Sequence, residues 1–194
     1  MRELPLFFSI TALVVLFGYI VYDGNRPSTE EVIFDNDEVG LEAEVYPLAT
    51  ISFDLPEQLS FAGEQVPLHI PDVRERLDRE LQINTYLHSS TIFIIKRASR
   101  WLPQIEPILK EYNIPDDFKY LPLIESALLN DVSPKAAVGF WQILKGSGKE
   151  LGLETTKEVD ERYDPLKAAR AACKYFNQSH SKLENWTLTA ASYD

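Results

Sequence analysis

Two neighbouring stretches decide what kind of domain this chain forms: Tyr120-Leu121-Pro122-Leu123-Ile124-Glu125-Ser126-Ala127-Leu128 and Ser133-Pro134-Lys135-Ala136-Ala137-Val138-Gly139-Phe140-Trp141-Gln142-Ile143. If the first stretch is helical, Glu125 shares a face with apolar residues, namely Leu121, Ile124, Leu128 and Leu129. Burial raises the pKa of a carboxyl group, which suits a general acid that works near neutral pH. The first stretch alone also fits an ordinary glutamate at a helix edge with its carboxylate in water, so the second stretch decides between the two interpretations.

Together the two stretches resemble the signature of lytic transglycosylases. The resemblance lies in Glu125-Ser126, in Ser133-Pro134 and in the run Gly139-Phe140-Trp141-Gln142, where Phe140 replaces a commoner leucine. It is nearest to the membrane-bound lytic murein transglycosylase D type, within the goose-type lysozyme superfamily. A third family motif is partly present as Ala191-Ser192-Tyr193-Asp194, with Asp194 in place of the usual asparagine. The resemblance extends from about residue 61 to residue 194.

The resemblance implies a mainly α-helical, lysozyme-like orthogonal domain that acts on the glycan strands of peptidoglycan. Glu125 is the expected catalytic acid and base, and Ser126, Gln142 and Tyr193 are the expected substrate-binding residues. Protonated Glu125 would donate to the oxygen of the MurNAc–GlcNAc β-1,4 bond. As a carboxylate it would then accept the proton of the muramic acid 6-hydroxyl, which closes on C1 to give a 1,6-anhydro end. This reaction needs no metal and no cofactor.

Other candidate residues have competing interpretations. Asp131 could be the second carboxylate of an ordinary glycosidase pair, but it lies in a turn sequence where aspartate is common. Trp141 either packs in the core under the site or contacts sugar. Cys173 lies on an apolar helical stripe and is expected to be a buried, unreactive thiol. The three histidines have no metal-ligand spacing, so no metal site is expected: His69, His88 and His180.

The charge of the chain is unevenly distributed. The net charge is −11, and the stretch 27–73 contains no lysine or arginine. Eleven of the 30 acidic residues lie there, which leaves the rest balanced with 19 acidic and 19 basic residues. Without a basic stripe to displace counterions from phosphates, nucleic acid is not an expected partner.

The N-terminal segment suggests export. The uncharged run Leu4–Tyr22 is long enough to cross a bilayer. We expect residues 1–22 to be a transmembrane signal anchor that holds the protein to the cell membrane with the rest facing the periplasm, a cleaved signal peptide being the alternative. Residues 23–70 are expected to form an acidic, proline-containing, irregular tether. Residues 71–194 are expected to form the lytic transglycosylase catalytic domain, incomplete at its C-terminal end.

Periodicity predicts the helices of this domain. Asp72 is the expected N-cap of a first helix, which buries Val73, Leu77 and Leu81. A helix that ends before Pro103 and a separate one after it are expected next. The full set of predicted helices is 72–81 and beyond, 91–101, 104–112, 115 through Glu125, 139–151, 165–183 and 186–193.

Three functions are compatible with these features. The first is a lytic transglycosylase in cell-wall remodelling, which the presence of Glu125 favours. The second is a non-catalytic lysozyme-like module that binds peptidoglycan, which the incomplete third motif favours. The third is a hydrolytic, lysozyme-type muramidase that uses water positioned by a group such as Asp131.

Overall fold

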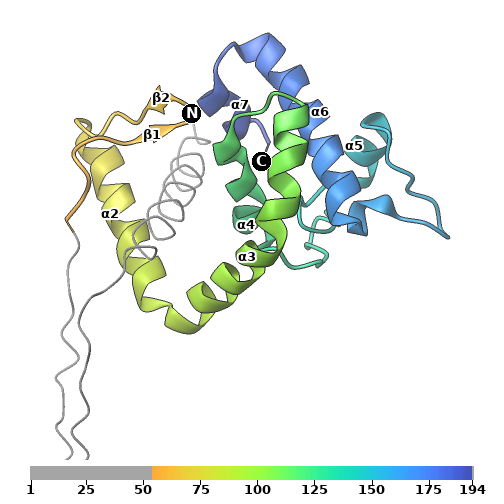
Figure 1. Ribbon diagram of the computed structural model, residues 1–194, viewed down its shortest axis with the longest axis horizontal. Helices are drawn as coiled ribbons and strands as arrows, with labels where there is room; N and C mark the ends of the chain where they lie inside the picture. The colour runs from red at the N-terminus through yellow and green to blue at the C-terminus, as the bar shows by residue number, and fades with distance from the viewer. Residues whose placement is uncertain (1–53, 194) are drawn as a thin grey trace, which may run out of the picture.

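The computed structural model describes residues 54–193, without the side chain of His88, and shows a mainly α-helical domain (Figure 1). The predicted mainly α-helical fold class is thereby confirmed. The elements in chain order are β1 (Ser60–Phe61), β2 (Glu64–Gln65), α2 (Pro71–Tyr86), α3 (His88–Glu111), the 3-10 helix η1 (Asp116–Tyr120), α4 (Leu121–Ser126), α5 (Lys145–Glu150), the 3-10 helix η2 (Glu161–Tyr163), α6 (Pro165–Leu183) and α7 (Trp186–Ala191).

The predicted membrane anchor and most of the predicted tether lie outside the described residues. Within residues 54–193, no helix combines the length and the apolar character needed to cross a bilayer.

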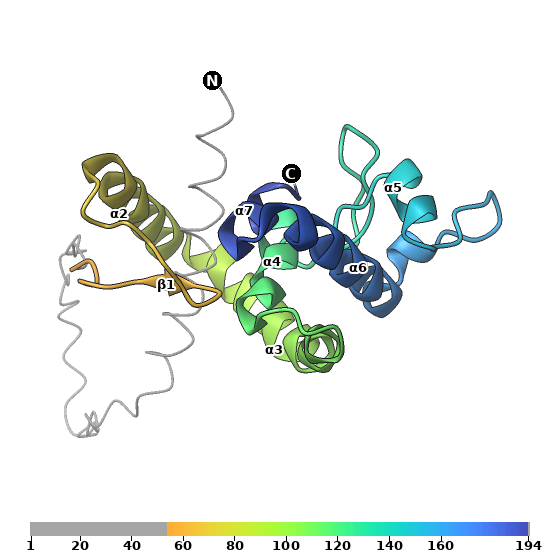
Figure 2. The same ribbon diagram turned by 90° about the horizontal axis from the view of Figure 1, so that it is seen from above.

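One hydrophobic core joins α3, η1, α4, α6 and α7. Phe118, Trp141 and Phe176 are fully buried at its centre, and the Phe118 and Phe176 rings meet edge to face at 4.8 Å between centroids. Figures 1 and 2 show α7 at the C-terminal end of α6 and α5 near its N-terminal end. The elements that carry the sequence motifs therefore pack around this core.

Helix α3 is a single helix that contains two prolines, so the predicted break at Pro103 is wrong. Proline lacks an N–H group and clashes with the preceding turn, which normally ends or bends a helix. Here the apolar stripe continues through Pro103 and Pro107, with Ala98, Ile105 and Leu109 all buried. Figure 1 shows α3 bending along its length, which accommodates the prolines without ending the helix.

Helix α2 packs its apolar face against residues 55–68, which precede it. Val73, Leu77 and Leu81 are buried as predicted, in a second apolar cluster with Leu68 and the half-buried Leu55, Leu59 and Val66. The predicted N-cap is wrong by two residues: the cap position is Ile70, because Pro71 occupies the first helical turn. Asp72 lies inside that turn and forms an ion pair with Arg76 at 3.1 Å.

A short antiparallel hairpin, β1–β2, precedes α2. Its two-residue turn has Ala62 at φ 52° and Gly63 at φ 81°, a left-handed pair typical of tight hairpins. Phe61 is buried in the main core, with its ring 5.5 Å from that of Phe118. Part of the segment predicted to be irregular is thus an ordered piece of the domain.

The predicted helix 165–183 is confirmed as α6. The Asp164 carboxylate caps it by accepting hydrogen bonds from the N–H groups of Leu166 and Lys167, both at 3.0 Å. Cys173 is fully buried on this helix, and burial raises the pKa of its thiol to about 12. The predicted burial is confirmed, and the raised pKa disfavours the thiolate, which is the nucleophilic form.

Candidate active site

Helix α4 presents Glu125 one residue before its end. The predicted continuous helix from residue 115 is divided into η1 and α4, and α4 stops at Ser126 because Ala127 and Leu128 adopt left-handed backbone angles of φ 52° and 56°. Glu125 is half-buried, beside the fully buried Leu121 on the same helix. The expectation that Leu129 shares this apolar face is wrong, because it lies past the helix end and is 41% exposed.

Arg97 holds this helix end in place. Two consecutive non-glycine residues in the left-handed region are unfavourable by roughly 1–2 kcal/mol each. The Nε of Arg97, on α3, donates a hydrogen bond to the carbonyl oxygen of Ala127 at 2.7 Å. A hydrogen bond from a charged donor is stronger than one between neutral groups and offsets part of this strain. Sequence reasoning missed Arg97, because its partner is a backbone carbonyl 30 residues away.

The second motif, residues 136–143 around Gly139-Phe140-Trp141-Gln142, forms a tight loop. The prediction that a helix starts at Gly139 is wrong. Isolated antiparallel bridges pair Val138 with both Val132 and Ile143, and regular helix begins only at Lys145 in α5. Gly139 has φ +78°, and a Cβ atom there would lie 2.3 Å from the carbonyl oxygen of Arg162. Only glycine fits this position, which explains why the loop needs it.

Ser126 joins the first motif to the second. Its hydroxyl oxygen lies 2.9 Å from the carbonyl oxygen of Phe140 and 3.1 Å from that of Pro122. The hydroxyl proton is therefore directed at backbone carbonyls, and its lone pairs remain available to accept a hydrogen bond. This contact fixes the residue next to Glu125 against the second-motif loop.

Tyr193 joins the third motif to the second. Its hydroxyl donates a hydrogen bond to the carbonyl oxygen of Trp141 at 2.7 Å. Burial raises the pKa of the Tyr193 hydroxyl well above its ordinary value, and the negative charge of Glu125 raises it further. Tyr193 therefore stays neutral beside the carboxyl group. Its ring packs against those of Phe176 and Tyr175, at 5.1 Å and 5.4 Å between centroids.

Gln142 is half-buried at the turn of the second-motif loop, with a left-handed φ of 45°. Its side-chain Nε2 donates to the carbonyl oxygens of Gly139 at 2.8 Å and Asp131 at 3.2 Å. The amide nitrogen thus orders its own loop. Asp131 is exposed and takes part through its backbone.

Trp141 is a core residue, so the first of its two interpretations, packing under the site, is the one that the structure supports. The side chain is fully buried, and its ring lies 6.1 Å from that of Phe176. The ring packs in the core beneath the loop that carries Phe140 and Gln142, and neither of its faces is exposed to solvent.

A buried arginine supports the second-motif loop from below. The Nη1 of Arg162 donates to the carbonyl oxygens of Ala136 at 3.2 Å and Ile143 at 3.0 Å, the two ends of the loop. Its Nε and Nη2 bind the Asp160 carboxylate at 2.9 Å and 2.7 Å, and this pairing lowers the pKa of Asp160. The fork geometry of a guanidinium group makes four such bonds possible at once. No sequence pattern marks Arg162, since it lies in a short 3-10 turn without periodicity.

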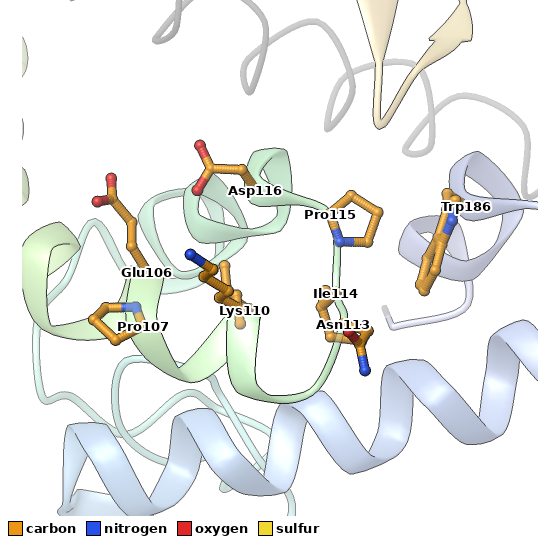
Figure 3. A pocket seen from close by; sticks show the side chains of 9 residues that line it. Glu106, Pro107, Lys110, Asn113, Ile114, Pro115, Asp116 and Trp186 are labelled. Atoms are coloured by element: carbon orange, nitrogen blue, oxygen red, sulfur yellow. The ribbon is translucent and has the colours of Figure 1, made fainter.

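A separate groove of about 800 Å³ lies at the C-terminal end of α3. Figure 3 shows Trp186 next to Pro115, with Asp116, Lys110 and Glu106 further along the groove. Its lining includes none of the four candidate site residues. No cluster of metal-ligating side chains occurs among residues 54–193.

Residues 96–194 match the family model described as the Transglycosylase SLT domain. The chain belongs to the transglycosylase SLT domain family. Its SLT domain includes all four candidate site residues and begins inside α3, so it leaves out β1, β2 and α2.

Two relatives of this SLT-domain chain carry the name Membrane-bound lytic murein transglycosylase D, one from Escherichia coli (strain K12) and one from Escherichia coli O6:H1 (strain CFT073). Each is 30% identical over 140 residues, which is 70% of this chain. The matched stretch covers 30% of the length of each relative.

Proposed function

We propose that this SLT-domain protein is a lytic transglycosylase that cleaves the MurNAc–GlcNAc bond of peptidoglycan and leaves 1,6-anhydro ends. The observation that carries the proposal is the convergence of three motifs at Glu125. Ser126 contacts the second-motif loop through the Phe140 carbonyl, and Tyr193 contacts the same loop through the Trp141 carbonyl while its pKa responds to the charge of Glu125.

In the proposed reaction Glu125 acts first as an acid. It donates its proton to the glycosidic oxygen while the bond from that oxygen to C1 of the muramic acid breaks. The N-acetyl group of the substrate stabilises the positive charge that develops at C1. This role suits a half-buried carboxyl group at the end of a helix that packs on the core, because the group is held in place and is still accessible to the substrate.

Glu125 then acts as a base. Its carboxylate accepts the proton of the 6-hydroxyl as that oxygen bonds to C1, so the acid is regenerated and no water is consumed. Tyr193 donates to the Trp141 carbonyl and holds the third motif against the loop, so its contribution is to position neighbouring groups. The Nε2 of Gln142 is used within its own loop, so the side-chain carbonyl oxygen is the group that Gln142 offers to an N–H or hydroxyl group of the sugar.

The same proposal includes the setting of the enzyme. The catalytic domain, residues 71–194 together with the β1–β2 hairpin that packs on its core, has a lysozyme-like fold that binds the glycan strand. An anchor at residues 1–22 and the acidic tether that follows hold it at the membrane, facing the periplasm, where the peptidoglycan lies. The names of the two relatives, which contain the words membrane-bound and murein, support attachment to a membrane and a peptidoglycan substrate.

Digestion of purified peptidoglycan sacculi, read by mass spectrometry, tests the proposal. The chain should release muropeptides lighter than hydrolytic products by one water molecule and lacking a reducing end. Glu125→Gln should lower turnover by about 10²–10⁴-fold with the fold retained by circular dichroism. Glu158→Gln, at an exposed loop position, is the matched control and should keep full activity.

Two other outcomes would contradict the proposal. Products with ordinary reducing ends would identify a hydrolase of the lysozyme type. A folded chain that binds sacculi and releases nothing would identify a non-catalytic binding module.

A further inference from the structure

We propose that the β1–β2 hairpin positions α7, and with it Tyr193, for the reaction at Glu125, and that Glu64 is the positioning residue through which it acts. This inference rests on the proposed function of the site. The hairpin lies outside the SLT match, which starts at residue 96, so no family motif assigns it a role.

The hairpin is attached to the catalytic side of the core at its turn. Phe61 is 2% exposed and packs against Phe118 of η1. The N–H group of Ala62 donates to the Asp117 carboxylate, also in η1, at 2.6 Å. Because η1 runs directly into α4, both contacts hold the helix that carries Glu125.

Glu64 makes the third attachment, to the start of α7. Its Oε1 accepts from the Trp186 N–H at 2.7 Å, and its Oε2 accepts from the Thr187 N–H at 2.9 Å and from the Thr187 hydroxyl. These are the first two N–H groups of the helix, which have no partner within the helix itself. A carboxylate at this end also interacts favourably with the helix dipole.

The remaining N–H groups of the first turn are satisfied locally. The Asn185 side chain accepts from the Leu188 N–H at 2.7 Å, and the Asn185 carbonyl accepts from the Thr189 N–H at 3.0 Å. All four N–H groups at the start of α7 therefore have acceptors, two of them supplied by Glu64 from more than 120 residues away.

Helix α7 is too short to fix its own position. It contains six residues, and isolated helices of this length are not stable in water. Tyr193 follows it by two residues and makes the contact with the Trp141 carbonyl. The hairpin thus connects the two sides of the candidate site: η1 and α4, which present Glu125, and α7, which presents Tyr193. Figure 1 shows β2 next to the start of α7.

The test compares Glu64→Gln, which keeps the shape of the side chain but removes its charge, with Glu57→Gln, an exposed position on the same segment. The first readout is hydrogen exchange in the full chain. Peptides covering 184–193 should exchange faster in Glu64→Gln, while peptides covering α6 should be unchanged, and Glu57→Gln should match the wild type throughout.

The second readout is the split between kcat and KM on soluble glycan strands. Glu64→Gln should lower kcat roughly 10-fold with KM nearly unchanged, since a misplacement of about 1 Å in an active site costs up to about 10²-fold. Glu64→Asp keeps the charge and should recover part of the loss. If Glu64→Gln unfolds, Thr187→Val removes only the hydroxyl contact and should give a smaller change in the same direction.

The two hypotheses fail in different ways. A folded wild-type chain without transglycosylase products refutes the proposed function. Unchanged exchange at 184–193 in Glu64→Gln overturns the inference about the hairpin, and so does faster exchange there with wild-type kcat, which would make Glu64 a purely structural residue.

Discussion

Replacing Gly139 by alanine tests whether the second-motif loop is built as described. The backbone angle of φ +78° is unfavourable for any residue with a Cβ, at a cost of about 1–2 kcal/mol. The new Cβ would also lie 2.3 Å from the Arg162 carbonyl oxygen, a backbone atom that cannot turn away. Forcing the loop to shift adds about 1–3 kcal/mol, so the free energy of unfolding should fall by about 2–5 kcal/mol.

Two other glycines separate these contributions. Gly63 has φ +81° but open space where a Cβ would go, so Gly63→Ala should cost only the strain, about 1–2 kcal/mol. Gly146 lies in α5 with open space and no strained angle, so Gly146→Ala should be neutral or stabilise by about 0.5 kcal/mol. Urea unfolding of the three variants gives the comparison, with the slope m required to stay constant.

Activity gives a second measure of the same change. The loop carries Gln142 and the Phe140 carbonyl that binds Ser126, so Gly139→Ala should lower kcat even where the protein is still folded. The reasoning is refuted if Gly139→Ala costs no more than Gly63→Ala, because the collision with Arg162 would then not exist.

Three further predictions concern the groups that hold the site. Arg162→Lys should lower the free energy of unfolding by about 2–4 kcal/mol in urea titrations, since one ammonium cannot replace the guanidinium bonds to both loop carbonyls and Asp160. A free energy of unfolding equal to that of the wild type within experimental error would contradict this prediction. Tyr193→Phe should cost about 1 kcal/mol of stability by loss of the bond to Trp141, and should lower kcat more than it changes KM in steady-state assays. Burial alone would raise the pKa of Glu64, but the hydrogen bonds that its carboxylate accepts outweigh burial and lower the pKa from 4.5. The stability that Glu64 contributes is therefore complete above pH 4.5 and is lost as the pH falls through the lowered pKa of the folded state. Thermal unfolding between about pH 5 and 3 should therefore show a weaker pH dependence in Glu64→Gln than in the wild type, and parallel curves would exclude this contribution.

The sequence predicted the elements whose signals are local. Helix α6 was predicted at its correct bounds, because Asp164-Pro165 begins it and its apolar stripe is regular. The first-motif helix and the burial of Cys173 also follow from local patterns, whereas the sequence left Trp141 open between a core position and a contact with sugar. Family membership follows from three motifs in order, which no single periodicity could have supplied.

The features that the sequence missed depend on contacts between distant segments. Prolines in α3 predicted a break, yet tertiary burial of one continuous stripe on α3 outweighs their local cost. The helix predicted at 139–151 begins only at Lys145, because the left-handed backbone of Gly139 and Gln142 makes the second motif a loop. Arg97, Arg162 and Glu64 bind backbone groups across 19 to 123 residues, and such partners leave no periodic pattern.

Digestion of sacculi in water enriched with heavy oxygen tests the central claim most directly. If Glu125 passes the proton from the 6-hydroxyl and the anhydro ring closes on C1, the muramyl ends of the products should contain no heavy oxygen and should lack a reducing end. The Glu125→Gln variant should release almost none of them. Heavy oxygen at C1 of the muramyl ends would mean that water attacks the sugar, and it would contradict the account.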